Sequence, residues 1–155
     1  MIRLLPTILL AISLIACHPK GREFVKHKDL SPELEWLKKD AREFQVPVDD
    51  ISITYNMSLA FRYANGFQHQ FLMVKVTEIS PDGAEEVKNY TLKIREENGR
   101  YIGEPGYDIW DSEHLVEEAK RYEKRGTYTY IIEHNMPVDP VNFAMEIGLI
   151  LDRKE

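Results

Sequence analysis

Residues 51–63 read Ile-Ser-Ile-Thr-Tyr-Asn-Met-Ser-Leu-Ala-Phe-Arg-Tyr. Every odd position of this stretch holds an apolar or aromatic side chain, whereas the even positions hold Ser, Thr, Asn, Ala or Arg. A two-residue period maintained over this length is typical of a β-strand that buries one of its faces. We therefore expect a long strand over 51–63, whose odd-numbered side chains lie in the core of a β-rich domain.

Strand-like stretches recur along the rest of the chain, and turn sequences such as Asn65-Gly66 and Pro81-Asp82-Gly83 separate them. The stretch 71–79 is apolar on both faces, which favours a central place in a sheet, whereas Pro47 favours a sheet edge. The further strands are expected over residues 22–28, 44–48, 71–79, 87–94, 128–132 and 143–151. Seven or more strands with at most one short helix indicate a mainly β protein, a single antiparallel β-sandwich of the jelly-roll or immunoglobulin-like type.

Alternation also predicts which side chains of the later strands face the core. In the last strand it places Leu149 in the core and Ile150 on the opposite face. In the strand over 87–94, the expected core contacts are Val87, Leu92 and Ile94.

The segment 112–122 carries conflicting signals. A capping Ser112, Glu113 in the first turn and an apolar stripe that includes Leu115 and Ala119 are typical of a helix. The spacing of Tyr122, Gly126 and Tyr128 also fits a sandwich that turns a corner into a strand. We expect a short helix at 112–118 followed by an extended piece at 119–122, with helix against strand left open.

The N-terminus has the layout of a secretory signal peptide. Arg3 precedes an apolar run that is too short to span a membrane as a helix, and the run ends in Leu14-Ile15-Ala16-Cys17. This ending resembles a bacterial lipobox, in which the cysteine thiol is alkylated because a thiolate is the most readily alkylated side chain. Two or more acyl chains make a durable anchor, since a single chain binds a membrane only marginally. The alternatives are an ordinary signal peptide or a short N-terminal membrane anchor.

These observations divide the chain into three parts. Residues 1–16 are predicted to be a cleaved lipoprotein signal peptide, residues 17–22 the lipidated Cys17 with a flexible tether, and residues 23–155 the β-sandwich domain. Cys17 is the sole cysteine, so no intramolecular disulfide can form. A net charge of −6 without a clustered basic patch argues against nucleic acid as a partner.

The residues that commonly carry out catalysis do not form a recognisable set. The five histidines are scattered without a metal-ligand spacing, and there is no nucleophile elbow or phosphate-binding loop. We therefore expect no enzyme activity, no metal and no cofactor apart from the diacylglycerol and acyl chains on Cys17. Arg62 could bind a partner carboxylate, although an ordinary surface ion pair is the favoured interpretation.

Two loops are the candidate partner-binding surfaces, because binding residues gather on loops that a rigid scaffold positions. Their proposed contact residues are Gly103, Gly106, Tyr107, Asp108, Trp110 and Asp111 in the first loop and Asn135 and Met136 in the second. Trp and Tyr often dominate interfaces, and prolines stiffen the second loop in advance. Asp108, Asp111 and Glu113 could alternatively hold calcium or a sugar, or simply cap a turn while Trp110 and Met136 fold onto the core.

Taken in order, several short stretches resemble the gliding-motility lipoprotein H (GldH) family of gliding and related Gram-negative bacteria. They are Cys17 of the lipobox, Phe44-x-Val46-Pro47, Tyr55-Asn56-x-x-Leu59-x-x-Arg62, Pro81-Asp82-Gly83, Gly103-x-x-Gly106-x-Asp108-Ile109-x-Asp111, Gly126-Thr127-Tyr128-Thr129-Tyr130, Ile132-Glu133-x-Asn135-Met136 and Glu146-Ile147-Gly148-Leu149. The resemblance covers nearly the whole chain and rests on the order of these stretches.

The resemblance implies a non-enzymatic lipoprotein that supports surface gliding and the associated secretion machinery. Its expected partners are the membrane, through the lipid anchor, and other envelope proteins of motility and secretion. Its expected location is the cell envelope, at the outer membrane and facing the periplasm, because residue 18 is His rather than the Asp of the common inner-membrane retention signal. A carbohydrate- or ligand-binding sandwich is the alternative.

Overall fold

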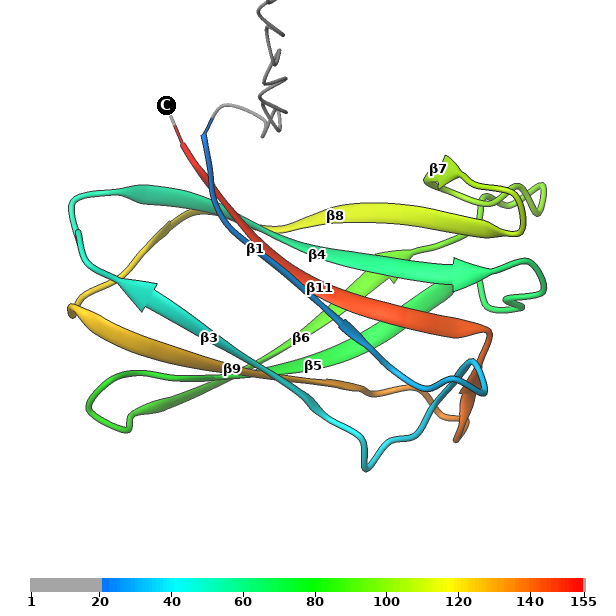
Figure 1. The fold of residues 1–155 in the computed structure, drawn as a ribbon, viewed down its shortest axis with the longest axis horizontal. Helices are drawn as coiled ribbons and strands as arrows, with labels where there is room; N and C mark the ends of the chain where they lie inside the picture. Colours follow the sequence, from blue (N-terminus) through cyan, green and yellow to red (C-terminus); the bar gives the residue numbers. More distant parts are fainter. Residues whose placement is uncertain (1–20, 155) are drawn as a thin grey trace, which may run out of the picture.

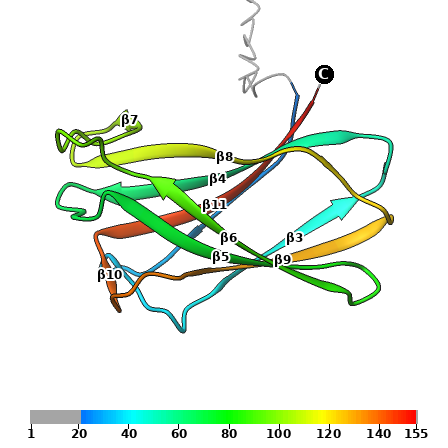
Figure 2. The ribbon, with the colours of Figure 1, turned by 180° about the vertical axis from the view of Figure 1, so that it is seen from behind.

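Two antiparallel β-sheets stack face to face in the computed structural model, which describes residues 21–154 (Figures 1 and 2). One sheet has five strands in the order β1-β11-β4-β8-β7, and the other has four in the order β3-β9-β5-β6. A two-stranded piece pairs β10 with β2. The predicted antiparallel β-sandwich is confirmed. Across 21–154 no helix occurs, and hence none that could cross a membrane.

The strands follow one another with short connections. Their bounds are β1 Arg22–Asp29, β2 Glu35–Trp36, β3 Arg42–Val48, β4 Thr54–Ala64, β5 Phe71–Ile79, β6 Glu85–Lys93, β7 Glu104–Pro105, β8 Ile109–Arg121, β9 Gly126–His134, β10 Val141–Asn142 and β11 Ala144–Arg153. As the sequence predicted, β5 is central, between β9 and β6, and β3 with its proline is an edge strand.

Strand β4 is the centre of the larger sheet, flanked by β11 and β8. Its odd-numbered side chains from Tyr55 to Tyr63 are buried, as the two-residue period predicts. The strand begins at Thr54 rather than at Ile51, however. The Asp50 carboxylate accepts a hydrogen bond from the backbone N–H of Ser52 at 2.9 Å, and this local turn takes Ile51 out of the strand.

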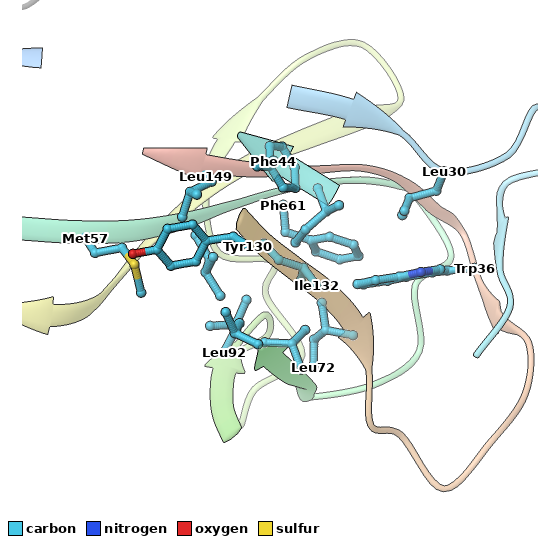
Figure 3. Close-up of a cluster of buried hydrophobic side chains, with 14 of the residues drawn as sticks. Leu30, Trp36, Phe44, Met57, Phe61, Leu72, Leu92, Tyr130, Ile132 and Leu149 are labelled. Carbon is cyan, nitrogen blue, oxygen red and sulfur yellow. The ribbon is translucent and has the colours of Figure 1, made fainter. Parts of the chain in front are cut away.

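Both sheets contribute to one core between them (Figure 3). Phe61 of β4 and Ile132 of β9 meet there, and Trp36 of β2 enters the same cluster from the connection between β1 and β3. Trp36 is fully buried, and its indole N–H donates to the Asp40 carbonyl at 2.9 Å. The indole N–H is the only polar group of this side chain, and it finds its hydrogen-bond partner within the same connection while the ring closes the end of the core.

The outer face of the five-stranded sheet is covered more than the alternation predicts. Leu149 lies in the core as expected, but Ile150, on the opposite face, is buried as well, as are Ser58 and Ala60. A Cβ on Gly148 would come within 2.7 Å of His27 Nδ1, so the His27 ring crosses this part of the sheet. Small residues on the outer face thus form a hollow that longer side chains border.

The helix predicted at 112–118 is wrong, because residues 109–121 form the long strand β8. Two register shifts interrupt its pairing with β4, where Met57 faces Glu117 and Ser58 faces Leu115. Each shift adds one residue to β8, and Ala119 takes a left-handed φ of 55° at one of them. Leu115, expected on a helical apolar stripe, is exposed instead.

Strand β6 also corrects one expectation. Leu92 and Ile94 are buried as predicted, but Val87 is 54% exposed. Val87 pairs with Thr77 of β5, whereas the inward positions of β6 pair with the buried Val76, Val74 and Leu72. Val87 therefore points away from the core, on the outer face of the four-stranded sheet.

The two ends of the sandwich differ in character. At one, which we call the anchor end, β1 begins beside the end of β11, and the Arg153 N–H donates to the Gly21 carbonyl at 2.7 Å. The opposite, loop end holds the longer connections, with β7 and β10 within them (Figures 1 and 2).

Candidate functional site

The first predicted loop, Gly103–Asp111, folds into a tight hairpin at the loop end. Its strand β7 pairs with the start of β8, where Glu104 faces Asp111. Gly103 has a φ of 128°, and a Cβ there would lie 2.3 Å from the Asp111 carbonyl oxygen. A Cβ on Gly106 would lie 2.7 Å from Ile109 Cγ1. Both glycines therefore permit close packing of this hairpin.

Asn65 fastens the hairpin to the end of β4. Its backbone N–H donates to the Asp108 carbonyl at 2.9 Å, and its amide donates to Asp108 Oδ1 at 3.2 Å. Its side-chain oxygen accepts the indole N–H of Trp110 at 2.8 Å. The Trp110 ring is half-buried, 5.4 Å from the Tyr101 ring. Trp110 and Asp108 are thus held in place, whereas Tyr107 is 97% exposed.

Asp111 is engaged by Arg62. The guanidinium donates from Nε at 2.7 Å and from Nη2 at 3.1 Å, a bidentate arrangement that raises the pKa of Arg62. Arg62 Nη1 also lies 3.7 Å from Glu146 Oε2. The structure therefore places Arg62 in an intramolecular ion pair. Since the two side chains are substantially exposed, the pair contributes little to stability.

The second predicted loop follows β9 at the same end of the sandwich. Asn135 is exposed, and its N–H donates to the Met73 carbonyl at 2.8 Å. Met136 is buried, and its sulfur accepts the N–H of Met73 at 3.2 Å. Met136 therefore folds back against β5, while Val138, two residues later, is exposed.

His134 joins this loop to the core. It is fully buried, with its ring edge-on to Trp36 at 5.4 Å between centroids. Its Nδ1 accepts the Met136 N–H at 3.3 Å, while Nε2 finds no hydrogen-bond partner among residues 21–154 and lies 3.6 Å from Asp139. Burial lowers the pKa of His134 more than the Asp139 carboxylate raises it, so the ring is neutral at pH 7.

Four large apolar side chains are exposed at the loop end, although each belongs to a different segment. We call them together the loop-end surface: Phe71, Tyr107, Val138 and Phe143. Phe143 has a left-handed φ of 63°, and its ring lies 3.0 Å from where a Cβ of Gly66 would be. The Asn65-Gly66 turn therefore lies between the hairpin that carries Tyr107 and the start of β11.

Two hollows elsewhere carry charged side chains. One, of about 490 Å³, lies on the outer face of the five-stranded sheet over Ala60 and Ile150. Its rim holds ion pairs, in which Arg22 bonds Glu113 at 2.9 Å and His27 Nδ1 lies 3.0 Å from Glu146.

The other hollow, of about 450 Å³, opens between the edges formed by β6 and β8. Lys120 lies in it with only 7% of its side chain exposed, 2.6 Å from Glu78 and 3.3 Å from Glu117. Glu117 also accepts from Lys88 at 2.7 Å and from the Tyr90 hydroxyl at 2.5 Å. Burial alone would raise the pKa of Glu117, but these hydrogen bonds and the lysine charges lower it.

Comparison with known protein families assigns the chain to one of them. The family model for the GldH lipoprotein matches residues 23–151, which is most of the chain. The chain belongs to the GldH lipoprotein family. It is accordingly a membrane-anchored lipoprotein. No curated protein sequence matches it. Cys17, the predicted lipidation site, lies outside the described residues.

Several of the residues first matched to the GldH lipoprotein family meet in three dimensions. Arg62 of β4, Asp111 of β8 and Glu146 of β11 come together on the rim of the outer-face hollow. Asn56 accepts the Ala119 N–H at 3.2 Å and so holds one β8 bulge. Among the described residues, no three or more His, Cys, Asp or Glu side chains are grouped so as to hold a metal ion.

Sequence reasoning on this GldH lipoprotein did not find the Lys120 cluster or the buried His134. The cluster depends on the pairing of β8 with β4, and residues 112–118 had been predicted to be helical. The two lysines and two glutamates of the cluster come from three strands, β5, β6 and β8, so no single stretch of sequence indicates it. His134 ends an alternating stretch, so its inward direction could have been read from Tyr128, Tyr130 and Ile132.

Proposed function

We propose that the chain is a non-enzymatic adaptor of the cell envelope that supports gliding motility and the associated protein secretion machinery. In this proposal Cys17 carries the diacylglyceryl and acyl chains, residues 1–16 are removed, and the protein is held at the outer membrane facing the periplasm. Its partners are other envelope proteins of that machinery, and nucleic acid is not among them. Family membership supports the lipoprotein part, and the resemblance described above supports the process.

One observation carries the adaptor role. The described chain begins at Gly21, at the anchor end, while the loop-end surface lies at the opposite end of the strands. A strand the length of β4 spans about 35 Å. A partner could therefore reach the loop-end surface without competing with the lipid anchor. Loops that a rigid sandwich holds in place are also the usual site of recognition.

Tyr107 is the best probe of this surface. Replacing Trp110 or Asp108 would also remove hydrogen bonds to Asn65, and so would loosen the hairpin itself. Tyr107→Ala removes an almost fully exposed ring instead. We expect this variant to capture far fewer partners when full-length protein is crosslinked in gliding cells, and to reduce the spreading of colonies, with an unchanged thermal midpoint.

Ile51→Ala is the matched control, because Ile51 is an exposed apolar side chain at the anchor end. It should retain capture and spreading. Equal capture by both variants, or an equal loss in both, would contradict the assignment of the loop end as the partner surface.

A second candidate function, ligand binding, is favoured by the outer-face hollow. Its volume of about 490 Å³ is within the range of small-molecule sites, about 300–1,000 Å³. Arg62 on its rim could exchange Asp111 for a ligand carboxylate or sugar hydroxyl. A glycan array and a thermal-shift panel would identify such a ligand, and Arg62→Gln should abolish the response. A response that Arg62→Gln leaves unchanged would move the site elsewhere.

A further inference from the structure

Strand β6 is a long sheet edge with one side unpaired. It pairs with β5 through nine consecutive residues, from Glu85 opposite Ile79 to Lys93 opposite Phe71, without a register shift. Within residues 21–154 no strand pairs with its other side. A regular row of backbone N–H and C=O groups therefore faces outward, which is the chemistry that recognises another extended strand.

The other edges of the sandwich carry features that hinder strand addition. Strand β3 contains Pro47, and β8 has two bulges and is partly covered by β7. Strand β1 has a register shift between Arg22 and Phe24.

By comparison β6 contains no proline, glycine or bulge. The ammonium group of Lys88 is held by Glu117 at 2.7 Å and by Glu86 at 3.1 Å, so it does not project from the edge as an unpaired charge.

The outward-facing side chains of β6 form a row with a particular symmetry. In order they are Glu85, Val87, Asn89, Thr91 and Lys93, and all five are exposed. The row begins with an acid and ends with a base, and a polar amide lies at its centre. If it is reversed and laid beside itself, each acid meets a base and each Val meets a Thr.

We propose that β6 pairs antiparallel with β6 of a second copy of this chain, centred on Asn89. Glu85 of one copy then lies opposite Lys93 of the other, and Val87 lies opposite Thr91. Opposite charges and β-branched pairs directly across an antiparallel ladder stabilise it. The two four-stranded sheets become one continuous eight-stranded sheet, and the contact is isologous and closed, as in most dimers.

The lipid anchors are compatible with this arrangement. The two-fold axis of such a pair runs perpendicular to the sheet, so both five-stranded sheets lie on the same side of the dimer. Both copies of Arg22, where the described strands begin, are then on that side. Strand β1 is also the edge of its sheet farthest from β8, and hence away from the contact. Because the strands of the two copies run in opposite directions, the two anchor ends lie at opposite ends of the joined sheet, and one membrane holds both chains when it lies along the five-stranded sheets.

A disulfide at the two-fold axis tests the register directly. Opposite residues in an antiparallel ladder have Cα atoms about 4.5–5.5 Å apart, which a disulfide can bridge. Membranes are isolated from cells that produce the full-length Asn89→Cys variant and treated with copper phenanthroline. We expect a reducible dimer at a yield far above that of the unmodified chain, whose only cysteine is Cys17.

Two further variants distinguish this register from random collision. The Val87 positions of the two copies would be about 14 Å apart, four residues along the ladder, so Val87→Cys alone should stay at background. The double variant Val87→Cys/Thr91→Cys should crosslink efficiently. The double variant also provides the test if Asn89→Cys does not fold.

Charge reversal supplies a readout that is independent of cysteine position. Added to Asn89→Cys, Lys93→Glu should lower the dimer yield roughly three- to ten-fold, and adding Glu85→Lys as well should restore it. A dimer yield no higher than that of the unmodified chain, both for Asn89→Cys and for the double cysteine variant, would overturn the proposal. So would equal yields for Asn89→Cys and Val87→Cys, or crosslinks only to a different protein.

Discussion

His134 shows what one buried polar side chain implies for this protein. Its ring is enclosed by the core and touches Trp36, and the second nitrogen has no hydrogen-bond partner among the residues described. Protonating it in the folded state would bury a charge that the Asp139 carboxylate favours and the Lys38 charge opposes. The folded protein therefore holds His134 neutral, and its stability must depend on pH.

The sign of that dependence follows from the lowered pKa. The unfolded chain binds a proton near the ordinary value of 6.5, whereas folded His134 does so only at lower pH. Stability is thus fully present above about pH 6.5 and falls as the pH drops below it, by up to about 1.4 kcal/mol per pH unit. Urea unfolding between pH 7.5 and 5 measures this slope.

His134→Gln should flatten the slope of the free energy of unfolding over that range. His114, whose pKa burial also lowers, would supply a remaining part. An unchanged slope in His134→Gln would show that this histidine is not the titrating group.

At the scale of single residues, the sequence predicted the alternating core well and the polar contacts poorly. The odd positions from Tyr55 to Tyr63 are buried because a strand with one covered face must alternate. Ile150 did not follow the rule, since its face is covered too. Trp36 lies in the short strand β2 and is fully buried, although no alternating pattern surrounds it in the sequence.

At the scale of elements, β8 explains the main error. Its partners on β4 place His114, Glu117 and Lys120 opposite Leu59, Met57 and Tyr55. Two bulges stretch the inward spacing from two residues to three, which is close to the period of a helix. The spacing of inward side chains in this segment was therefore compatible with both a helix and a bulged strand, and the pairing with β4 makes it a strand. Partner strands of this kind override local propensity.

Ala119 provides a test of that bulge. Its left-handed φ of 55° disfavours any residue with a Cβ, so Ala119→Gly should raise the free energy of unfolding by about 0.5–1 kcal/mol. The matched control is Ala60→Gly in β4, whose φ is not left-handed and which should lose about 1 kcal/mol. Chemical denaturation of both variants measures the difference. A destabilised Ala119→Gly would show that the bulge is not strained.

At the scale of the whole molecule, the sequence predicted the antiparallel sandwich but not which strands pair with one another. Turn signals and strand periods indicated an antiparallel sandwich, because few other arrangements cover so many half-apolar strands. The pairing of β1 with β11 joins residues about 130 positions apart, as in the bond from Arg22 to Asp152, and no local pattern encodes it. The two candidate loops were named from the sequence, but their place at the same end of the sandwich and the hydrogen bonds of Asn65 to the first of them were not predicted.

The anchor is the prediction that belongs to the whole molecule. Mass spectrometry of protein extracted from membranes should find a mature N-terminus at Cys17, without residues 1–16 and with a thioether-linked diacylglyceryl group. Cys17→Ser should leave the membrane fraction, because it removes the alkylated thiol. A free thiol on Cys17, or a retained Met1, would contradict both the lipidation and the proposed location.

The position of β1 has a mechanical consequence. Its seven registered pairs with β11 are joined by hydrogen bonds that run across the strands. If a moving partner pulls on the loop end while the membrane holds Gly21, the force runs along the strands and loads these bonds together in shear. Force applied sideways at Arg22 would instead break them one at a time. The sandwich therefore resists tension along its long axis. A pull on its anchor would be transmitted through β1 to β11 without separating these two strands pair by pair.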